Sequence, residues 1–586
     1  EVNRFYKTST TKEQLVRKQK TSRQCSRLRG QAELEGIMSV IIENNIVKSC
    51  VPRSIIPDVN FAEFFADVCQ KHKDKTALVD AKSNRRHTFG QLLDASRRVA
   101  AGLRRLGLST GDVVAFHCGN SSELVVALCG TFFSGGTAAL IKTILTRGET
   151  HHQLSDVGPK FVFCDQEGIK KIEDVCKEVP SVEAIILTTG TYKEMLTLSE
   201  LKESTADHIP TPVDLKPDAV LAIIYSSGST GLPKGVQISH RNLIAQILLF
   251  RHLDDSIFQK GDICLGSAAL CHVGGFWINF GFLGNANTVV YVDTSDIQVI
   301  LPAIEKHKAT TILLYPTFMV KLNQSQLLSQ FDTSSLTKLM VAGGTISSHV
   351  LQSLAKKLRL KGTIQVFGMT EVTGGVTLSI PRHDDFRSAG HPGAFVEIKV
   401  VDSHTREALE PFQQGEICVR SPTNFVGYLR RPKETADMYE DGFIRTGDMG
   451  YYSPDGRIFV CGRLKELIKC MDQQVAPAEL EELLIPDHEV RHAVVVGVPH
   501  PHFGEAARAF IVPRRRLQPG SLEEQEEASR LQDLVAAHLA YHKHLHGGVE
   551  FLDSIPHSAN GKDLRNVLKQ AYIRQHMTAT DQCNGT

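Results

Sequence analysis

The 586-residue sequence has almost no excess charge of either sign, since 66 Lys and Arg residues stand against 65 Asp and Glu residues. A chain without a net field lacks a general attraction to nucleic acid or to an anionic membrane, although a local basic groove for a nucleotide is compatible with it. We therefore expect no nucleic-acid partner. The apolar fraction of 42% and the charged fraction of 22% are typical of a folded globular chain, and the length requires several domains.

No Cys-x-x-Cys pair occurs among the 13 cysteines, which are odd in number and thinly spread. This spacing fits neither a zinc site nor a secreted disulfide framework, and it favours reduced thiols in an intracellular compartment. The last residues lack the Ser-Lys-Leu peroxisomal address, so a cytoplasmic location is favoured. Residues 1–37 form a basic, polar extension without an apolar period, and a mitochondrial location follows only if this extension is a targeting leader.

Apolar runs long enough for a membrane helix are also missing. The stretch from Leu124 to Ile141 approaches the ~18 residues that such a helix requires, but Ser134, Gly135 and Gly136 interrupt it. We expect a buried helix that turns into a short strand, and no transmembrane segment. The sequence gives no indication of the oligomeric state.

Helical and strand patterns alternate from about Asn60 to Gly462, with short apolar runs such as residues 113–116, 161–163, 184–187 and 311–314 between helices. This alternation predicts an α/β fold with largely parallel sheets. We expect a large N-terminal domain of stacked α/β layers over residues 38–462. A small α+β domain follows over residues 463–578, and residues 579–586 form a tail.

The segment from Tyr225 to Val236 reads YSSGSTGLPKGV and follows an apolar run. Glycines allow backbone N–H groups to approach an anion closely, the hydroxyls add donors, and Lys234 adds a positive charge. The segment is chemically a phosphate cradle. It does not match a Walker A loop, because Lys234 is followed by Gly235 and not by Ser or Thr, and this disfavours a P-loop kinase or ATPase.

This segment resembles the signature loop of the adenylate-forming superfamily, and further family motifs follow in the family's order. They are Gln365–Glu371, Gly427–Tyr428, Thr446–Asp448, Gly462–Lys469, Gln474–Glu481 and Ser558–Lys562. The resemblance spans roughly residues 38–569. The motifs are similar in sequence to those of acyl-CoA synthetases, 4-coumarate–CoA ligases and beetle luciferases. It implies ATP-dependent activation of a fatty or aryl acid to an acyl-AMP with release of pyrophosphate, followed by transfer to coenzyme A. ATP, Mg²⁺, coenzyme A and a carboxylic acid are the implied ligands.

The same resemblance assigns roles to individual residues. Lys562, Thr370, Glu371 and Lys469 are expected to be catalytic, with Glu371 and Thr230 as Mg²⁺ ligands. The small domain is expected to be mobile, with Lys465 as its hinge. The acid pocket is expected at His272, Gly274, Phe276 and Val366. The expected nucleotide-binding residues are Ser226, Ser227, Gly228, Ser229, Thr230, Gly231, Lys234, Gly343, Gly344, Thr345, Gln365, Phe367, Gly368, Asp448 and Arg463.

Two positions depart from the family pattern. Val366 replaces a glycine that lines the acid pocket, and its branched side chain should narrow or redirect that pocket. Asp472 lies where relatives have a glycine beside the coenzyme A channel, so the second half-reaction is expected to be impaired more than adenylation. Two alternatives stay open. A luciferase-type monooxygenase shares every motif, and Asp472 leaves open a nucleotide-binding paralogue impaired in coenzyme A transfer. A metal site at His538 and His542 is a further, weaker one.

Overall fold

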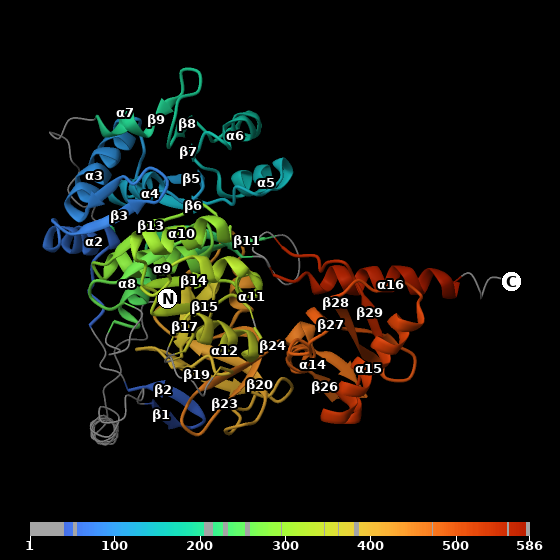
Figure 1. Ribbon diagram of the computed structural model, residues 1–586. Helices are drawn as coiled ribbons and strands as arrows, with labels where there is room; N and C mark the ends of the chain where they lie inside the picture. The colour runs from blue at the N-terminus through green and yellow to red at the C-terminus, as the bar shows by residue number, and fades with distance from the viewer. Residues whose placement is uncertain are drawn as a thin grey trace, which may run out of the picture.

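The computed structural model describes residues 40–50, 55–203, 215–226, 233–251, 258–294, 296–344, 346–360, 362–379, 386–471, 473–558 and 562–581. Three sheets and their helices build a large domain, and a fourth sheet belongs to a small C-terminal domain beside it (Figure 1). The predicted α/β architecture is confirmed. Within the described residues, no helix is long and apolar enough to cross a bilayer, and the cysteines are all free.

The first sheet has the order β21-β11-β10-β6-β5-β7-β8-β9. Its strands from β10 to β9 run parallel, whereas β10 and β11 form an antiparallel hairpin and β21 joins its edge. The strands are β5 (Val113–His117), β6 (Thr137–Leu140), β7 (Phe161–Cys164), β8 (Ala184–Leu187), β9 (Leu196–Thr197), β10 (Val220–Ser226), β11 (Lys234–Ser239) and β21 (Gly427–Tyr428). The accompanying helices are α3 (Phe89–Arg105), α4 (Ser122–Ser134), α5 (Arg147–Val157), α6 (Ile169–Cys176) and α7 (Leu198–Lys202).

The second sheet has the order β18-β17-β16-β15-β14-β12-β13-β3-β4. Its central strands are parallel, as the sequence predicted for residues 311–314. The strands are β3 (Thr76–Asp80), β4 (Arg86–Thr88), β12 (Ile263–Gly266), β13 (Thr288–Tyr291), β14 (Thr311–Leu314), β15 (Lys338–Val341), β16 (Ile364–Met369), β17 (Gly374–Leu378) and β18 (His391–Pro392). The helices are α2 (Phe61–Lys71), α8 (His240–Leu248), α9 (Val273–Gly284), α10 (Ile297–His307), α11 (Pro316–Gln324) and α12 (Ser348–Lys357).

The apolar run that resembled a membrane helix is a core element. All residues of α4 are buried, and Ser121 caps its first turn by accepting from the Leu124 N–H. After Gly135 the chain enters β6, as expected. The ring of Phe132 in α4 lies 5.7 Å from Phe61 of α2 and 5.9 Å from Phe280 of α9. This aromatic contact joins helices of the two parallel sheets into one core.

The third sheet is antiparallel and orders β1-β2-β19-β20-β23-β22, with β24 on the other side of β23. Its strands are β1 (Val40–Glu43), β2 (Ile46–Ser49), β19 (Glu397–Val401), β20 (Gly415–Arg420), β22 (Tyr439–Glu440), β23 (Phe443–Tyr452) and β24 (Ile458–Arg463), and α13 (Pro432–Ala436) precedes β22. Arg463 ends β24, so the predicted boundary between residues 462 and 463 falls inside a strand. Residues 464–467 lead from this sheet to the small domain.

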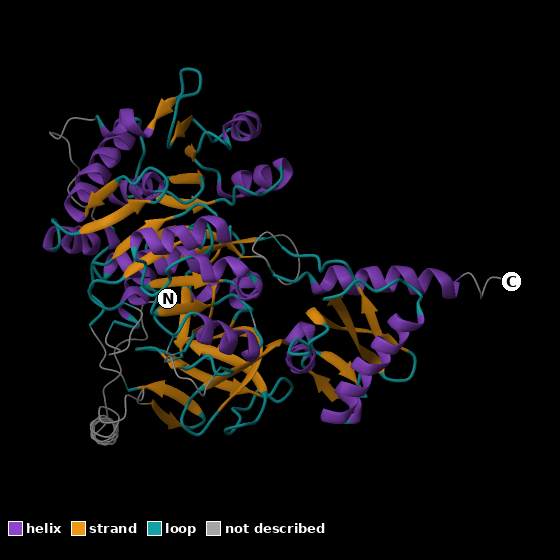
Figure 2. Ribbon diagram, in the orientation of Figure 1, coloured by secondary structure: helices purple, strands orange, loops and turns teal. Residues whose placement is uncertain are grey.

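The small domain contains a five-stranded sheet with the order β26-β25-β28-β27 and β29 beside β28. Its elements are β25 (Ile468–Cys470), β26 (Gln473–Val475), β27 (Val490–His500), β28 (Gly504–Pro513), β29 (Val549–Phe551), α14 (Pro477–Leu484), α15 (Leu522–His538) and α16 (Arg565–Asp581). Figure 2 shows its helices packed around this sheet.

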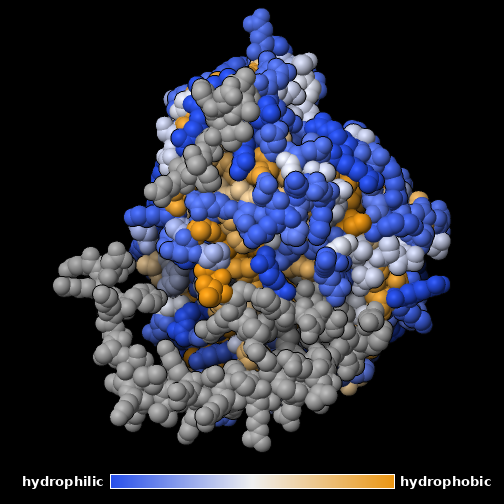
Figure 3. Space-filling model, turned by 90° about the vertical axis from the view of Figure 1, so that its left-hand side faces the viewer, coloured by the Kyte–Doolittle hydropathy of each residue, from blue (hydrophilic) through white to orange (hydrophobic). Residues whose placement is uncertain are grey.

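The two domains touch where α12 meets α14 and where α11 meets β27. The Ser348 N–H donates to Glu482 Oε1 over 3.2 Å, and the Gln324 amide donates to the Arg491 carbonyl over 3.4 Å. On the face shown in Figure 3, hydrophilic residues cover much of the described surface, and apolar residues gather in smaller groups between them.

Candidate active site

The hairpin of β10 and β11 brings Lys234 to the edge of the first sheet. Ser226, the last residue of β10, pairs with Lys234, the first residue of β11. Residues 227–232, which include the predicted Ser227, Gly228, Ser229, Thr230 and Gly231, lie outside the described residues. The Lys234 ammonium lies 4.9 Å from the centroid of the Tyr428 ring, within the range of a cation–π contact.

Tyr428 connects this hairpin to Glu371. Its hydroxyl donates to Glu371 Oε1 over 2.8 Å, and burial together with the Glu371 charge raises the pKa of Tyr428 well above its usual value. Glu371 is only 5% exposed, and its carbonyl accepts from the Phe425 N–H. The Lys234 ammonium, the Tyr428 ring and the buried Glu371 carboxylate therefore lie next to one another.

Glu371 follows β16 in a short 3₁₀ turn formed by residues 370–372, so Thr370 starts this turn. The approach of β16 to β17 requires glycine at position 368, because a Cβ there would lie 1.8 Å from the Gly374 carbonyl oxygen. Gln365 and Phe367 precede it in β16. The Gln365 side chain donates to the Ser388 carbonyl over 3.1 Å, and Phe367 is buried.

Asp448 and Arg463 face each other across β23 and β24, where they are register partners. Arg463 Nε lies 3.0 Å from Asp448 Oδ1, and Arg463 also donates to the Thr446 carbonyl. Asp448 is 6% exposed. Burial raises the pKa of its carboxyl to about 6, although the charges of Arg463 and Lys562 act in the opposite direction.

Lys562 comes from the small domain but lies against the large one. A Cβ added to Gly343 would lie 3.8 Å from Lys562 Cε and 3.1 Å from Tyr315 Cδ1, and Gly343 itself has a φ of +86°. Gly344 follows, while Thr345 lies outside the described residues. Burial and the nearby Arg463 charge lower the pKa of Lys562, whereas Asp448 raises it. The lysine is thus brought to the same place as Gly343, Asp448 and Arg463.

His272 lies at the start of α9, where its Nδ1 caps the helix through the Gly274 N–H at 3.5 Å. The Tyr315 hydroxyl is 3.4 Å from the same nitrogen. Burial lowers the pKa of His272 to about 3, and the charges of Lys142 and Lys562 act in the same direction. A neutral imidazole therefore lies near the two lysines.

The other two residues predicted for the acid pocket are placed differently. Phe276 is fully buried, and its ring lies 4.9 Å from Phe280 in the aromatic core. Val366 is 8% exposed. It packs against Gly375 beside Trp277, since a Cβ added to Gly375 would lie 2.4 Å from Val366 Cγ1 and 3.1 Å from Trp277. The structure does not bring Phe276 to the open site.

Lys469 is exposed in β25, between buried Ile468 and Cys470, and its N–H donates to Glu505. It does not share the environment of Lys562. Lys465 is exposed in the connecting segment between the domains. Asp472 lies outside the described residues.

Three residues near the site were not predicted. Tyr428 carries the contact between Lys234 and Glu371, Tyr315 lies against both Gly343 and His272, and the charge of Lys142 acts on His272 and Lys562. Tyr315 follows the strand predicted at residues 311–314, and the carboxyl end of a parallel strand is a common position for site residues. That signal was available in the sequence.

The metal site considered at His538 and His542 required the two side chains to share one helical face. His538 is the last residue of α15, whereas His542 lies in a separate 3₁₀ turn of residues 541–543, so this expectation was wrong. His538 Nδ1 lies 2.8 Å from the Leu534 carbonyl. Among the described residues, the one group of His, Cys, Asp or Glu with converging ligand atoms consists of His492, His557 and Asp563.

Comparison with known proteins identifies the family of the chain. The family model described as AMP-binding enzyme matches residues 65–429, and the model of its C-terminal domain matches residues 479–562. A probable 4-coumarate–CoA ligase of Dictyostelium discoideum is 32% identical over 88% of this chain and 96% of its own. A luciferin 4-monooxygenase of Nipponoluciola cruciata is 31% identical over 84% of this chain and 91% of its own.

Solved structures show the same architecture. The ATP-bound MatB of Rhodopseudomonas palustris is 26% identical and superposes with a TM-score of 0.78, covering 88% of this chain and 99% of its own. The family-model matches occupy both domains, and the curated relatives span most of the chain. The protein belongs to the family of AMP-binding enzymes, the adenylate-forming superfamily.

Proposed function

We propose that this enzyme activates a fatty or aryl carboxylic acid with ATP and then transfers the acyl group to coenzyme A. A carboxylate oxygen attacks the α-phosphorus, and pyrophosphate leaves with the electrons of the broken P–O bond. The coenzyme A thiol then attacks the acyl carbon, loses its proton, and displaces AMP. The observation that most directly supports this proposal is the position of Lys562. This lysine belongs to the small domain but lies near Gly343 and Asp448 of the large one.

Lys562 supplies positive charge where two anions must meet. The acid's carboxylate and the α-phosphate repel each other, so a cation between them stabilises the transition state more than the separated reactants. Because Lys562 is half-buried beside Gly343, its charge acts in a less polar medium than water. Thr370 would donate to the α-phosphate from the turn that also holds Glu371.

The nucleotide is held by the remaining predicted residues of the large domain. Asp448 would accept both ribose hydroxyls, and Arg463 would keep a fixed positive charge beside the ribose and phosphate. Gly343, Gly344 and Thr345 would form the adenine wall, close to Gln365, Phe367 and Gly368. Ser226, Lys234 and the connecting residues 227–231 would bind the β- and γ-phosphates.

Glu371 fits a magnesium ion. Mg²⁺ prefers hard oxygen ligands and is commonly held by one or two carboxylates together with substrate phosphates, and Glu371 offers a buried carboxylate that Tyr428 orients. Thr230 would be a second ligand. The bound ion would neutralise phosphate charge as pyrophosphate separates.

The acid would lie near His272 and Gly274, with Val366 limiting the pocket against Trp277. A panel of fatty, phenylpropenoic and benzoic acids tested for acid-dependent ATP–pyrophosphate exchange identifies the substrate class. Exchange with at least one acid, followed by acyl-CoA formation, is the expected result. Failure of every acid class to promote exchange with the intact protein would contradict the proposal.

A luciferase-type monooxygenase is the second candidate, because beetle luciferin 4-monooxygenases are among the relatives. This reaction shares the adenylation step and adds oxygen to the acyl-adenylate. Light emission with luciferin, ATP, Mg²⁺ and oxygen distinguishes it from ligation. A ligase without oxygenase activity gives exchange and acyl-CoA but no light.

The affinity for ATP is expected to fall as the pH decreases through about 6. Burial raises the pKa of Asp448 to about 6, and only the ionised carboxylate accepts from both ribose hydroxyls. One pH unit below that value, the affinity should drop by about tenfold. Direct ATP binding measured from pH 5 to 8 tests this, and Asp448→Asn should bind more weakly at pH 8 with no such dependence. A wild-type affinity that stays constant from pH 5 to 8 would exclude this role.

The folding stability of the unliganded protein should depend on pH with the opposite sign. The raised pKa means that the folded state holds this proton more tightly than the unfolded chain does. The corresponding contribution to stability is therefore present at pH values below about 4 and is lost as the pH rises through about 6.

Asp472→Gly is expected to accelerate coenzyme A transfer severalfold and to leave pyrophosphate exchange nearly unchanged. Cys470 pairs with Gln473, and Met471, which precedes Asp472 in the sequence, has a φ of 53°. Like charges at ~4–8 Å repel by about 2–4 kcal/mol at an effective dielectric near ~20, and screening reduces this. Single-turnover transfer from preformed acyl-AMP measures the effect. Asp472→Asn separates charge from volume, and equal rates for wild type and Asp472→Gly would refute the prediction.

A further inference from the structure

We propose that His492, His557 and Asp563 form a binding site for a divalent cation of the zinc type at the base of the loop that carries Lys562. His492 belongs to β27, whereas His557 and Asp563 flank the loop after β29. The ligand atoms of these side chains all lie within 4.8 Å of one another. The metal binding does not depend on the proposed activity.

The backbone holds two of the ligands in place. His557 and Asp563 form an isolated antiparallel bridge. One step further along, the Ser558 N–H donates to the Lys562 carbonyl over 2.7 Å, and the Lys562 N–H donates to the Ser558 hydroxyl over 3.0 Å. The loop from 557 to 563 is therefore closed at its base by the same residues that supply the ligands.

Two of the distances between the ligand groups are close to those around a tetrahedral ion. Asp563 Oδ2 lies 3.4 Å from His492 Nε2, and Asp563 Oδ1 lies 3.2 Å from His557 Nε2. Bonds of about 2.0–2.1 Å to a tetrahedral Zn²⁺ require ligand atoms roughly 3.3 Å apart. The Asp563 carboxylate thus lies between two imidazole nitrogens, each near a different oxygen at about this spacing, and the two imidazole nitrogens lie within 4.8 Å of each other.

A second observation concerns Asp563 Oδ1. This atom is buried and has no hydrogen-bond partner among the described residues, although an imidazole nitrogen lies 3.2 Å away. The contact is close, but its orientation is not that of an N–H donating to oxygen. A buried carboxylate oxygen without a hydrogen bond is costly, and a bound cation would satisfy it.

The surrounding charges permit a cation. Arg565, the positive group beside Asp563, donates to Glu481 over 2.9 Å and lies 3.4 Å from Glu466. Its charge is thus largely compensated by these carboxylates. Two imidazoles and one carboxylate suit Zn²⁺ better than Mg²⁺ or Ca²⁺, which prefer oxygen ligands. The side chains of His492 and Asp563 are each 21% exposed, which leaves access for a water as fourth ligand.

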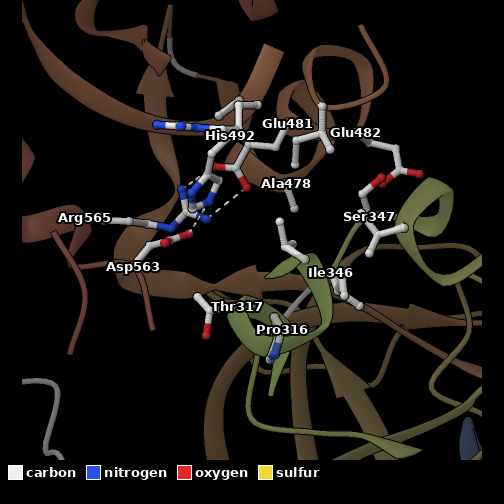
Figure 4. Close-up of a pocket in the computed structure, with 15 residues that line it drawn as sticks. Pro316, Thr317, Ile346, Ser347, Ala478, Glu481, Glu482, His492, Asp563 and Arg565 are labelled. Carbon is white, nitrogen blue, oxygen red and sulfur yellow. Dashed lines mark hydrogen bonds and ion pairs between the residues drawn. The ribbon is translucent and has the colours of Figure 1, made fainter. Parts of the chain in front are cut away.

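The site lies where the domains face each other. Figure 4 shows His492, Asp563 and Arg565 of the small domain on one side of a pocket, with Pro316, Thr317 and Ile346 of the large domain on the other. Because Asp563 directly follows Lys562, a bound ion would fix the lysine loop to β27. The consequence is a more rigid presentation of Lys562 to the large domain.

The test is a titration of the metal-depleted full-length protein with Co²⁺, whose absorption bands report tetrahedral coordination, followed by displacement with Zn²⁺. We expect one tight equivalent. His492→Ala and the nearly isosteric Asp563→Asn should each lower the affinity for Co²⁺. The decrease should exceed the roughly 10–100-fold loss that follows removal of an outer-shell partner. The matched control is His488→Ala, a histidine whose side chain is 80% exposed beside Asp487 and Glu489.

The control variant should bind the metal as the wild type does. Circular dichroism and thermal unfolding of Asp563→Asn show whether the fold is intact, so that lost binding reports a lost ligand. A wild type without a tight equivalent, or His492→Ala and Asp563→Asn variants that bind Co²⁺ as tightly as the wild type, would overturn the proposal.

Discussion

Replacing Lys562 with alanine is expected to lower the rate of acyl-adenylate formation by ~100-fold or more, the effect of removing one transition-state charge contact. The lysine is half-buried beside Gly343 and electrostatically coupled to Asp448 and Arg463. Conversion of supplied acyl-AMP to acyl-CoA should be largely spared. Acid-dependent pyrophosphate exchange and single-turnover thioester formation measure the two half-reactions separately.

Lys469→Ala is the matched comparison. Lys469 is exposed in β25 and lies apart from Lys562, and we expect its loss to slow thioester formation while adenylation continues. Opposite effects of the two substitutions would show that the small domain carries two functional lysines. Adenylation by Lys562→Ala at the wild-type rate would contradict the assignment.

Replacing Glu371 with glutamine is the second substitution with a large expected effect. The change preserves shape but removes the charge of a carboxylate that is 5% exposed. An amide is a poor ligand for Mg²⁺, so we expect kcat/KM for ATP to fall by ~100-fold or more. Adenylation rates across a range of Mg²⁺ concentrations check this, and higher Mg²⁺ should recover part of the activity.

Tyr428→Phe separates orientation from charge. It removes the hydroxyl that donates to Glu371 but keeps the ring beside Lys234. One hydrogen bond to a charged group contributes about 1.5–3 kcal/mol, so a loss of roughly tenfold to hundredfold is expected, below that of Glu371→Gln. A Glu371→Gln variant with unchanged Mg²⁺ dependence would remove Glu371 from the metal site.

The sequence predicted those features that depend on local pattern. The apolar run from residue 124 forms α4 and β6. Its uniformly apolar composition and the glycines that interrupt it can both be recognised in the sequence. The strand β27 spans Val490–His500 and is longer than the apolar run at residues 493–496. Its pairing with β28 continues through polar residues that the apolar pattern does not include.

Contacts between residues far apart in the chain could not be predicted from the sequence. Tyr428 and Glu371 are 57 positions apart, and the motifs that contain them indicate only their order along the chain. His492 and Asp563 meet because β27 lies beside the returning lysine loop, which no periodicity encodes. Phe276 shows the opposite problem. Its neighbours include the site residues His272 and Gly274, but one helical turn away its side chain enters the core.

The position of Arg463 at the end of β24 affects how an intermediate is retained. Arg463 and Asp448 belong to paired strands of one sheet, and the connection to the small domain begins only after them. A rotation about residues 464–467 would withdraw Lys562 and leave this ribose clamp intact. In the proposed two-step reaction, the adenylate would then stay anchored while the chemistry around its acyl end is exchanged. The proposed rotation would thus change the half-reaction without releasing a hydrolysable mixed anhydride to water.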